Sequence, residues 1–194
     1  MAGHVRYTAL LDACVLYPVT VADVLMSLAR TGLFAAKWSI EIESEWLTNV
    51  AKANEHLKLD RLERRRALMR LAVPDWEVPQ RKYSPLVPAI VLPDANDRHV
   101  LAAAIAGHAD CIVSANTRDF PEEALSVHDI ELIHPDDFVI MQWDMDPLVA
   151  LQALKTMRTR FKAPPLTAEE FADRLERSGL YVTAERIREA GGLI

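Results

Sequence analysis

The sequence has only two cysteines, Cys14 and Cys111, among its 194 residues. Two cysteines are too few for a disulfide framework, and both lie in apolar surroundings, so we expect buried free thiols. The six histidines are scattered, and none is paired with a cysteine or another histidine at the spacing of a zinc site. These absences exclude a disulfide-rich scaffold and a zinc finger.

The sequence also lacks any stretch that is long and apolar enough to span a bilayer. Its N-terminus has neither the apolar segment nor the cleavage site of a signal peptide, so we expect a cytoplasmic protein with no membrane partner. No glycine-rich phosphate loop is present to indicate a nucleotide-dependent enzyme.

Basic residues are in the minority, and the formal net charge is -6. A protein that binds nucleic acid by charge alone is usually basic, so this class is disfavoured. A metal-dependent nuclease is not disfavoured, because its site must concentrate carboxylates and the bound cation then inverts the local field.

Short apolar runs alternate with helical periodicity along most of the chain. We expect buried strands at 8–11, 111–114 and 130–133, and helices at 21–30, from Ser39 onward, at 57–71 and at 96–105. Residues 73–93 contain five of the eleven prolines, which predicts strand and loop rather than helix. The alternation predicts an α/β protein with a mostly parallel sheet covered by helices on both faces.

The character of the sequence changes after Trp143, where only helical patterns follow. Thr167 and Glu170 form a capping box that opens one of these helices, whose apolar stripe includes Phe171. We divide the chain into an α/β domain at 1–146 and a helical C-terminal appendage at 147–194. The appendage is too short for a core of its own, so its stripe should pack within the same chain.

Acidic side chains follow the ends of the predicted elements. Asp12 ends the first strand, Asp94 and Asp97 stand at the start of a helix, and Asn116 and Asp119 follow the second strand. In an open parallel sheet, ligand sites lie outside the carboxyl ends of the strands, so these side chains should converge. Oxygen ligands are what Mg²⁺ or Mn²⁺ requires, and such an ion activates water for attack on a phosphodiester.

Each acid alone has an ordinary structural explanation. Asp94 could be a turn or helix cap, and Asp97 could complement the dipole of its helix. Glu41, Glu43 and Glu45 could form a solvated helix face, and spacing alone does not bring Glu45 to the site. Only the acids taken together favour a metal site.

The helix expected at 57–71 is rich in arginine. One interpretation is a solvated face that pairs with Glu63, and the other is a phosphate-contacting edge beside the acidic site. The arginines are Arg61, Arg64, Arg65, Arg66 and Arg70.

Four segments resemble the PIN-domain nuclease family. The most specific are 92–104 (LPDANDRHVLAAA) and 109–121 (ADCIVSANTRDFP), which together resemble the family signature. The segment 11–18 (LDACVLYP) is similar to the family's first strand and acid, and 38–46 (WSIEIESEW) to the helix that carries its glutamate. The resemblance covers roughly residues 8–142.

The resemblance implies a three-layer α/β/α fold and cleavage of single-stranded RNA with Mg²⁺ or Mn²⁺. Many members are VapC-type toxins that an antitoxin holds in check, which makes RNA, an antitoxin and a second copy of the chain the candidate partners. By the same resemblance, the metal-binding acids are Asp12, Glu45, Asp97 and Asp119.

Three further positions follow from the resemblance. Ser114 matches a hydroxyl position beside the site, and Asp94 matches a frequent accessory acid. Asn116 stands where the family often has aspartate, so one negative charge is missing and tight binding of a second metal is in doubt. The tail after Trp143 lies outside the shared domain.

A competing hypothesis is a PIN-like fold that binds RNA or protein with weak or no catalysis. Asn116 favours this hypothesis slightly, whereas the intact Asp12, Asp97 and Asp119 favour the nuclease. An acidic phosphotransferase or dehalogenase-like enzyme would need a second acid two residues after its nucleophile, and Cys14 stands there instead.

Overall fold

The computed structural model of the chain describes residues 6–53, 56 and 59–194. At its centre lies a sheet of four parallel strands in the order β2-β1-β3-β4. In register, Ala9 of β1 lies opposite Ala36 of β2 on one side and Cys111 of β3 on the other. The strands are β1 (Thr8–Leu11), β2 (Ala35–Lys37), β3 (Cys111–Val113) and β4 (Glu131–Ile133).

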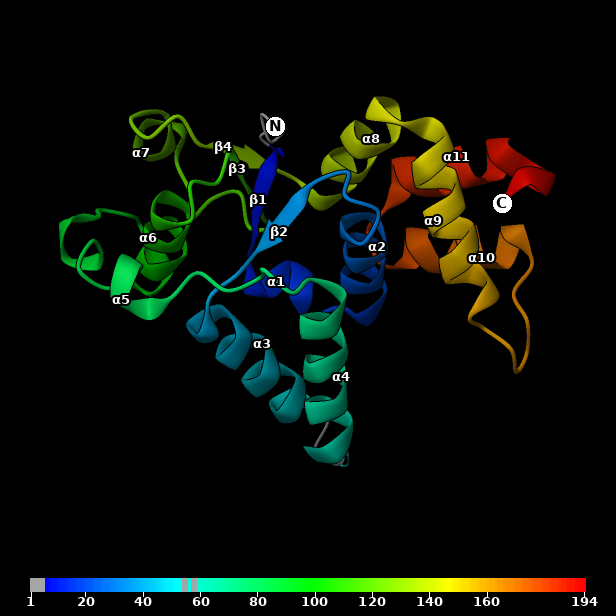
Figure 1. Cartoon of the computed structure of the whole chain (residues 1–194), viewed down its shortest axis with the longest axis horizontal. Helices are drawn as coiled ribbons and strands as arrows, with labels where there is room; N and C mark the ends of the chain where they lie inside the picture. The colour runs from blue at the N-terminus through cyan, green and yellow to red at the C-terminus, as the bar shows by residue number, and fades with distance from the viewer. Residues whose placement is uncertain (1–5, 54–55, 57–58) are drawn as a thin grey trace.

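Helices cover both faces of this sheet (Figure 1). Helix α6 (Arg98–Ala106) and the short α5 (Gln80–Tyr83) lie on one side, and α2 (Val19–Ala29) lies on the other. The central strands are apolar throughout because both of their faces are buried: every residue of β3 is buried, as are the last three of β1. The predicted three-layer α/β/α fold with a parallel sheet is confirmed.

Helices α3 (Ile40–Ala53) and α4 (Leu59–Ala72) form a hairpin below the sheet in Figure 1. Ser39 begins α3 as predicted, since its hydroxyl accepts a hydrogen bond from the backbone of Ile42 at 3.1 Å. The predicted start of α4 at residue 57 lies outside the described residues. Two glutamates of α3 contact different partners: Glu43 contacts Arg70 of α4, and Glu45 contacts His99.

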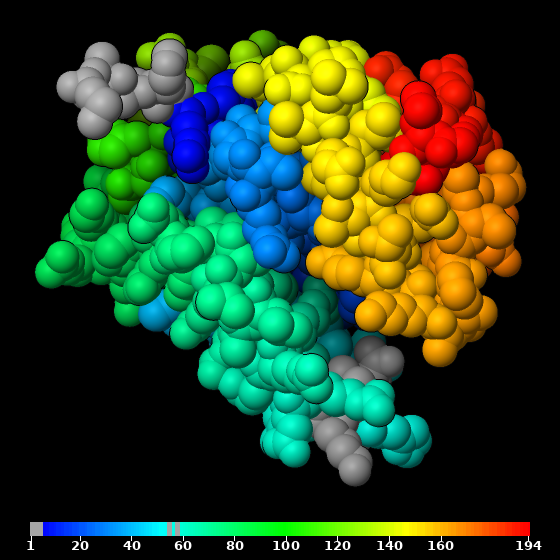
Figure 2. Space-filling view, turned by 45° about the vertical axis from the view of Figure 1, so that its right-hand side comes forward, coloured from blue at the N-terminus to red at the C-terminus, as the bar shows by residue number. Residues whose placement is uncertain are grey.

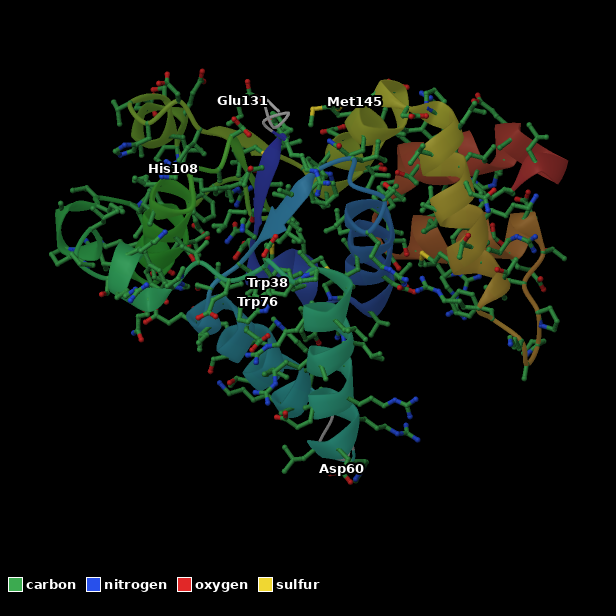
Figure 3. All side chains as sticks on the ribbon, in the orientation of Figure 1. Trp38, Asp60, Trp76, His108, Glu131 and Met145 are labelled. Atoms are coloured by element: carbon green, nitrogen blue, oxygen red, sulfur yellow. The ribbon has the colours of Figure 1, made fainter. Side chains whose placement is uncertain are left out.

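Glu43 points inward and holds the hairpin together. Its buried carboxylate accepts two hydrogen bonds from Arg70 of α4, one of them from Nε at 3.0 Å. The Arg70 guanidinium lies 4.6 Å over Trp76, whose ring stacks on Trp38 at 5.0 Å. Figure 3 shows the two tryptophans side by side where β2 ends. Because Glu43 is fully engaged here, it is a structural residue rather than part of a solvated face.

The expectation of a strand within 73–93 is wrong. All of these residues are described, and they form α5, the 3-10 turn η1 (Val87–Ala89) and loops, with only an isolated bridge from Trp38 to Glu77. Pro79 directly precedes α5 and Pro88 lies in the first turn of η1, where a missing N–H costs nothing. The prolines therefore begin short helical turns instead of excluding them.

The C-terminal helices pack on α2, on the side of the molecule turned forward in Figure 2. As expected, the stripe of α10 is buried in the same chain: Phe171, Leu175 and Leu180 are 0% exposed. Both hydrogen bonds of the predicted capping box at Thr167 and Glu170 form. The helices are α8 (Pro135–Met145), α9 (Pro147–Thr159), α10 (Ala168–Arg177) and α11 (Tyr181–Ala190).

Four shorter elements complete the described part of the chain. The 3-10 turns η2 (Ala95–Asp97) and η3 (Gly191–Leu193) lie at the start of α6 and after α11, and α7 (Glu122–Ser126) precedes β4. Helix α1 (Ala13–Leu16) continues directly from β1. Among the described residues, no helix is long and apolar enough to cross a membrane.

Asp136 of α8 closes the C-terminal helices by capping α11 from outside. Its carboxylate is buried and accepts hydrogen bonds from Val182 N at 2.8 Å, Thr183 N at 3.0 Å and Thr183 Oγ1 at 2.6 Å. Replacing Asp136 with alanine leaves these donors buried without a partner, which should destabilise the protein by about 2–3 kcal/mol. In a thermal melt we expect the Tm to fall by about 5–10 °C.

The exposed neighbour Asp137 is the matched control for this change. The Asp137→Ala variant removes the same group from the same helix turn without touching α11, so its Tm should stay within about 2 °C of wild type. Equal melting temperatures for the two variants would show that the α11 cap contributes nothing.

Candidate metal centre

Asp12 is held rigidly where β1 passes into α1. Its Oδ1 accepts a hydrogen bond from Ala13 N at 2.6 Å, and its Oδ2 accepts one from Ser114 Oγ at 2.7 Å. The backbone N–H of Asp12 donates to Val113 at 3.2 Å, which ties the ends of β1 and β3 together. The carboxylate is therefore fixed at the carboxyl edge of the sheet, and Ser114 orients it.

Cys14 also belongs to this site, although we expected it to be an ordinary buried thiol. Its Sγ donates to Asp12 Oδ2 at 3.0 Å and accepts from Ala115 N at 3.3 Å, and Ser114 Oγ lies 3.2 Å away. Burial and the Asp12 charge raise the pKa of Cys14 to about 12, so it remains a thiol. The sequence feature that could have predicted this role of Cys14 is its position two residues after Asp12.

Asp97 is the acid most affected by its neighbours. It stands at the start of α6 and has no hydrogen bond to the backbone there. Burial raises its pKa, and the charges of Asp12, Asp119 and Asp94, with a hydrogen bond to Asp119, raise it further, to about 7. The charges that act on Asp97 thus belong to the acids that the sequence predicts at this edge of the sheet. Asp94 itself is exposed and caps η2, accepting from Asn96 N at 2.8 Å.

Asn116 and Asp119 form a pair in the loop after β3. The Asn116 side-chain amide donates to Asp119 Oδ2, and the Asn116 backbone N–H donates to Ser114 Oγ at 3.0 Å. Asn116 thus contributes a donor that orients Asp119, where an aspartate would add a like charge. The loop links Asp119 to Ser114, and through Ser114 to Asp12.

Glu45 comes from a different element, helix α3, and contacts His99 of α6. The distance from Glu45 Oε1 to His99 Nε2 is 2.8 Å, and Glu41 Oε2 lies 3.7 Å from His99 Nδ1. Burial lowers the pKa of His99, but the carboxylates of Glu45, Glu41 and Asp12 outweigh burial and raise it. His99 follows Asp97 by two residues and lies in the first turn of the helix that Asp97 precedes. No periodicity in the sequence indicates that His99 bridges two helices.

The donor set fits a hard divalent cation by its chemistry. Asp12, Asp97 and Asp119 offer carboxylate oxygens, which Mg²⁺ and Mn²⁺ prefer, and none of the three forms an ion pair with a described lysine or arginine. Within the ranges that the structure describes, no group of three or more His, Cys, Asp or Glu side chains surrounds a point where a metal could sit. Burial and the charges of Asp12, Asp119 and Asp94 raise the pKa of Asp97, and a cation bound among these carboxylates would favour its ionised form.

The arginines of α4 divide into two groups. Arg65 donates to two backbone carbonyls at the end of α1 and lies 4.6 Å over Trp46, and Arg70 binds Glu43, so both are structural. In the second group, Arg66 pairs with Glu63, as one interpretation of the sequence predicted, and Arg61 and Arg64 line, together with Arg65, a cavity of about 410 Å³ between α2 and α4. Figure 2 shows this hollow between α4 and the C-terminal helices.

The acids follow the strands of a parallel α/β/α sheet at its carboxyl edge, which is where open sheets of this class bind their ligands. The family model of the PIN domain matches residues 8–118, more than half of the chain, and the chain belongs to the PIN-domain family. The family model of the VapC50 C-terminal domain matches residues 135–189, which run from α8 to α11.

One curated relative is the "Putative ribonuclease VapC50" of Mycobacterium tuberculosis. It is 38% identical to this chain over 79 residues, which are 41% of this chain and 47% of that protein. The matched region thus spans about half the length of the relative. No solved structure matches the chain.

Proposed function

We propose that this protein is a divalent-metal-dependent endoribonuclease that cleaves single-stranded RNA, and the toxin of a toxin–antitoxin pair. The observation that carries the proposal is the placement of Asp12 and the Ser114–Asp119 loop after adjacent parallel strands, where Ser114 donates to Asp12 and where burial, together with the charges of Asp12, Asp119 and Asp94, raises the pKa of Asp97 to about 7. Membership of the PIN-domain family and the name of the VapC50 relative support the same reaction class.

In this proposal, Asp12, Asp97 and Asp119 would hold Mg²⁺ or Mn²⁺, with Glu45 and Asp94 at the margin of the site. Bound there, the ion would supply an activated water and stabilise negative charge on the phosphodiester oxygens. The fixed position of Asp12 sets the geometry, because three hydrogen bonds orient its carboxylate.

Hydrogen bonds from neighbouring residues orient these acids. Ser114 donates to Asp12, and Asn116 donates to Asp119, so both carboxylates have their orientation fixed by neighbouring donors. Asp97 must lose its proton before it can bind a cation, and its pKa of about 7 makes metal affinity increase with pH through neutrality. With Asn116 in place of an acid, the site would hold one cation more tightly than a second.

Cleavage of defined RNAs by the wild-type protein tests the proposal directly. We expect an unstructured RNA to be cut in 1 mM Mn²⁺ or Mg²⁺ and to remain intact in excess EDTA, because the acids alone cannot stabilise the developing charge. The same sequence annealed to its complement should be cut at least about tenfold more slowly. Full cleavage in EDTA would contradict the role of the metal, and equal cleavage of the duplex would contradict the preference for single strands.

The alternative is a module that binds RNA or protein with weak or no catalysis. It is favoured by Asn116 and by the lack of a ready-made three-ligand group among the described residues. Retention of the intact RNA on the protein in Mn²⁺, with no cleavage, would support it. We also propose the division of the chain at 146/147 into a PIN-like domain and a helical appendage.

A further inference from the structure

His99 joins the two helices that carry acids of the candidate site. It lies on α6, two residues after Asp97, and its side chain is 12% exposed. Its Nε2 is 2.8 Å from Oε1 of Glu45 on α3, and the distance from its Nδ1 to the Glu41 carboxylate is 3.7 Å. The imidazole therefore spans two glutamates one helical turn apart.

The direction of the short hydrogen bond follows from its partners. An ionised carboxylate can only accept, so the proton lies on Nε2 of His99 and points at Glu45. The other ring nitrogen, Nδ1, is buried and has no hydrogen-bond partner. The ring is thus committed to a single contact of good geometry, and that contact is with Glu45.

The contact with His99 determines where the Glu45 carboxylate lies. Its side chain is 42% exposed, has several rotatable bonds, and lies four residues from the like-charged Glu41, so repulsion and side-chain entropy both favour turning away. The N–H of His99 offsets both effects and directs the carboxylate toward the start of α6, where Asp97 stands. The residues that hold Glu45 therefore come from α6 and not from its own helix.

We propose that His99 is a positioning residue that fixes the Glu45 carboxylate at the edge of the acidic site and acts only through Glu45. The inference rests on the proposed nuclease function for its kinetic consequences. The contact itself exists in the metal-free protein and can be tested without any activity.

The metal-free protein provides the first test. In protein labelled with nitrogen-15 at histidine, the His99 ring should carry a proton on Nε2, and the Glu45→Gln variant should shift the His99 ring signals. The exposed His128 gives the reference signals, which should not move. Unchanged His99 signals in Glu45→Gln would overturn the proposal whatever the activity of the protein.

Kinetics provides the second test, as a double-mutant cycle. We expect His99→Ala to lower kcat for Mn²⁺-dependent cleavage about 10- to 100-fold with little change in the KM for RNA, as loss of an orienting partner does. Because His99 acts through Glu45, the double variant His99→Ala/Glu45→Gln should be no slower than Glu45→Gln alone. His99→Gln, whose amide N–H reaches a similar position, should recover much of the loss.

Two controls distinguish this positioning role from an unspecific effect of removing a histidine or a charge. His128→Ala should cleave at the wild-type rate, and Glu41→Gln should reduce the effect of His99→Ala on kcat only in part, because it removes the repulsion from Glu41 but not the entropic cost of ordering Glu45. Multiplicative losses in the double variant, or wild-type kcat in His99→Ala, would overturn the positioning role. Absence of cleavage by wild type in Mn²⁺ would instead count against the proposed function, and the ring signals would still decide the contact.

Discussion

Replacing Asp12 with alanine is expected to reduce Mn²⁺-dependent cleavage of single-stranded RNA at least about a hundredfold, because a bound ion contributes several kcal/mol to transition-state stabilisation. Asp12 is the best-ordered acid of the candidate site: it is 7% exposed and holds contacts with Ala13, Cys14 and Ser114. Removal of its carboxylate takes away both a charge and the fixed point around which the other acids are arranged.

The fold should survive this change. The backbone of Asp12 keeps its bond to Val113, but Ala13 N, Cys14 Sγ and the buried Ser114 Oγ lose their acceptor, so the variant should melt at a lower temperature while keeping its fold. Removing one charge also relieves the repulsion on Asp97. We therefore expect an unchanged circular dichroism spectrum, and Asp12→Asn, which keeps the shape, should be as inactive as Asp12→Ala.

Asp110 offers a matched control for Asp12. It also flanks the central strands, but at their amino ends, where its carboxylate accepts from Thr8 N at 2.7 Å. Asp110→Ala should retain wild-type cleavage because it is at the wrong edge of the sheet for the site. Full activity in a folded Asp12→Ala protein would refute the mechanism and leave the binding-module hypothesis.

The features predicted correctly from the sequence are those that depend on local pattern. The apolar runs that become β1 and β3 are buried on both faces, and each ends directly at a polar site residue, Asp12 or Ser114. Capping signals at Ser39 and Thr167 place helix starts because they act within one turn. The parallel topology then brings the strand ends together without further information.

The features that could not be predicted depend on contacts between distant segments. Strand β2 has the sequence Ala-Ala-Lys, which shows no strand periodicity. It forms because its backbone pairs in parallel with β1. Glu43 and Glu45 are two residues apart on α3, yet one is buried against Arg70 and the other meets His99. Helical spacing predicts that the two side chains point in different directions. It does not predict their partners, because Arg70 and His99 come from later segments of the chain.

Asp97→Asn is expected to change stability and metal binding in opposite directions. The pKa of Asp97 is about 7 in the folded protein, against about 3.9 for an unperturbed aspartate. Between these values the folded state holds a proton that the unfolded state releases, so the contribution of Asp97 to stability is full below about pH 4 and is lost as the pH rises through 7. Asparagine has no such loss.

The variant should therefore melt higher than wild type at pH 8 in EDTA, by about 2–4 °C, the shift that about 1 kcal/mol gives in a chain of this size after allowance for solvent screening. The gain should shrink toward pH 5, where Asp97 of the wild type is protonated. Asp60→Asn, a change at the exposed start of α4, which lies at the end of the hairpin away from the sheet in Figure 3, should show no such pH-dependent gain.

Mn²⁺ should reverse the order of the two proteins. Wild-type Asp97 gives up its proton and binds the cation as a charged oxygen ligand, so saturating Mn²⁺ at pH 8 should raise the wild-type Tm by mass action. Asp97→Asn lacks that charge, and calorimetric titration should give an affinity at least about tenfold weaker, with little or no rise in Tm. Two results would show that Asp97 is not part of the metal centre: an Asp97→Asn variant whose Tm rises as much in Mn²⁺ as that of wild type, or a variant no more stable than wild type at pH 8 in EDTA. Both follow because the negative charge that interacts unfavourably with the neighbouring acids must be the same charge that attracts the ion.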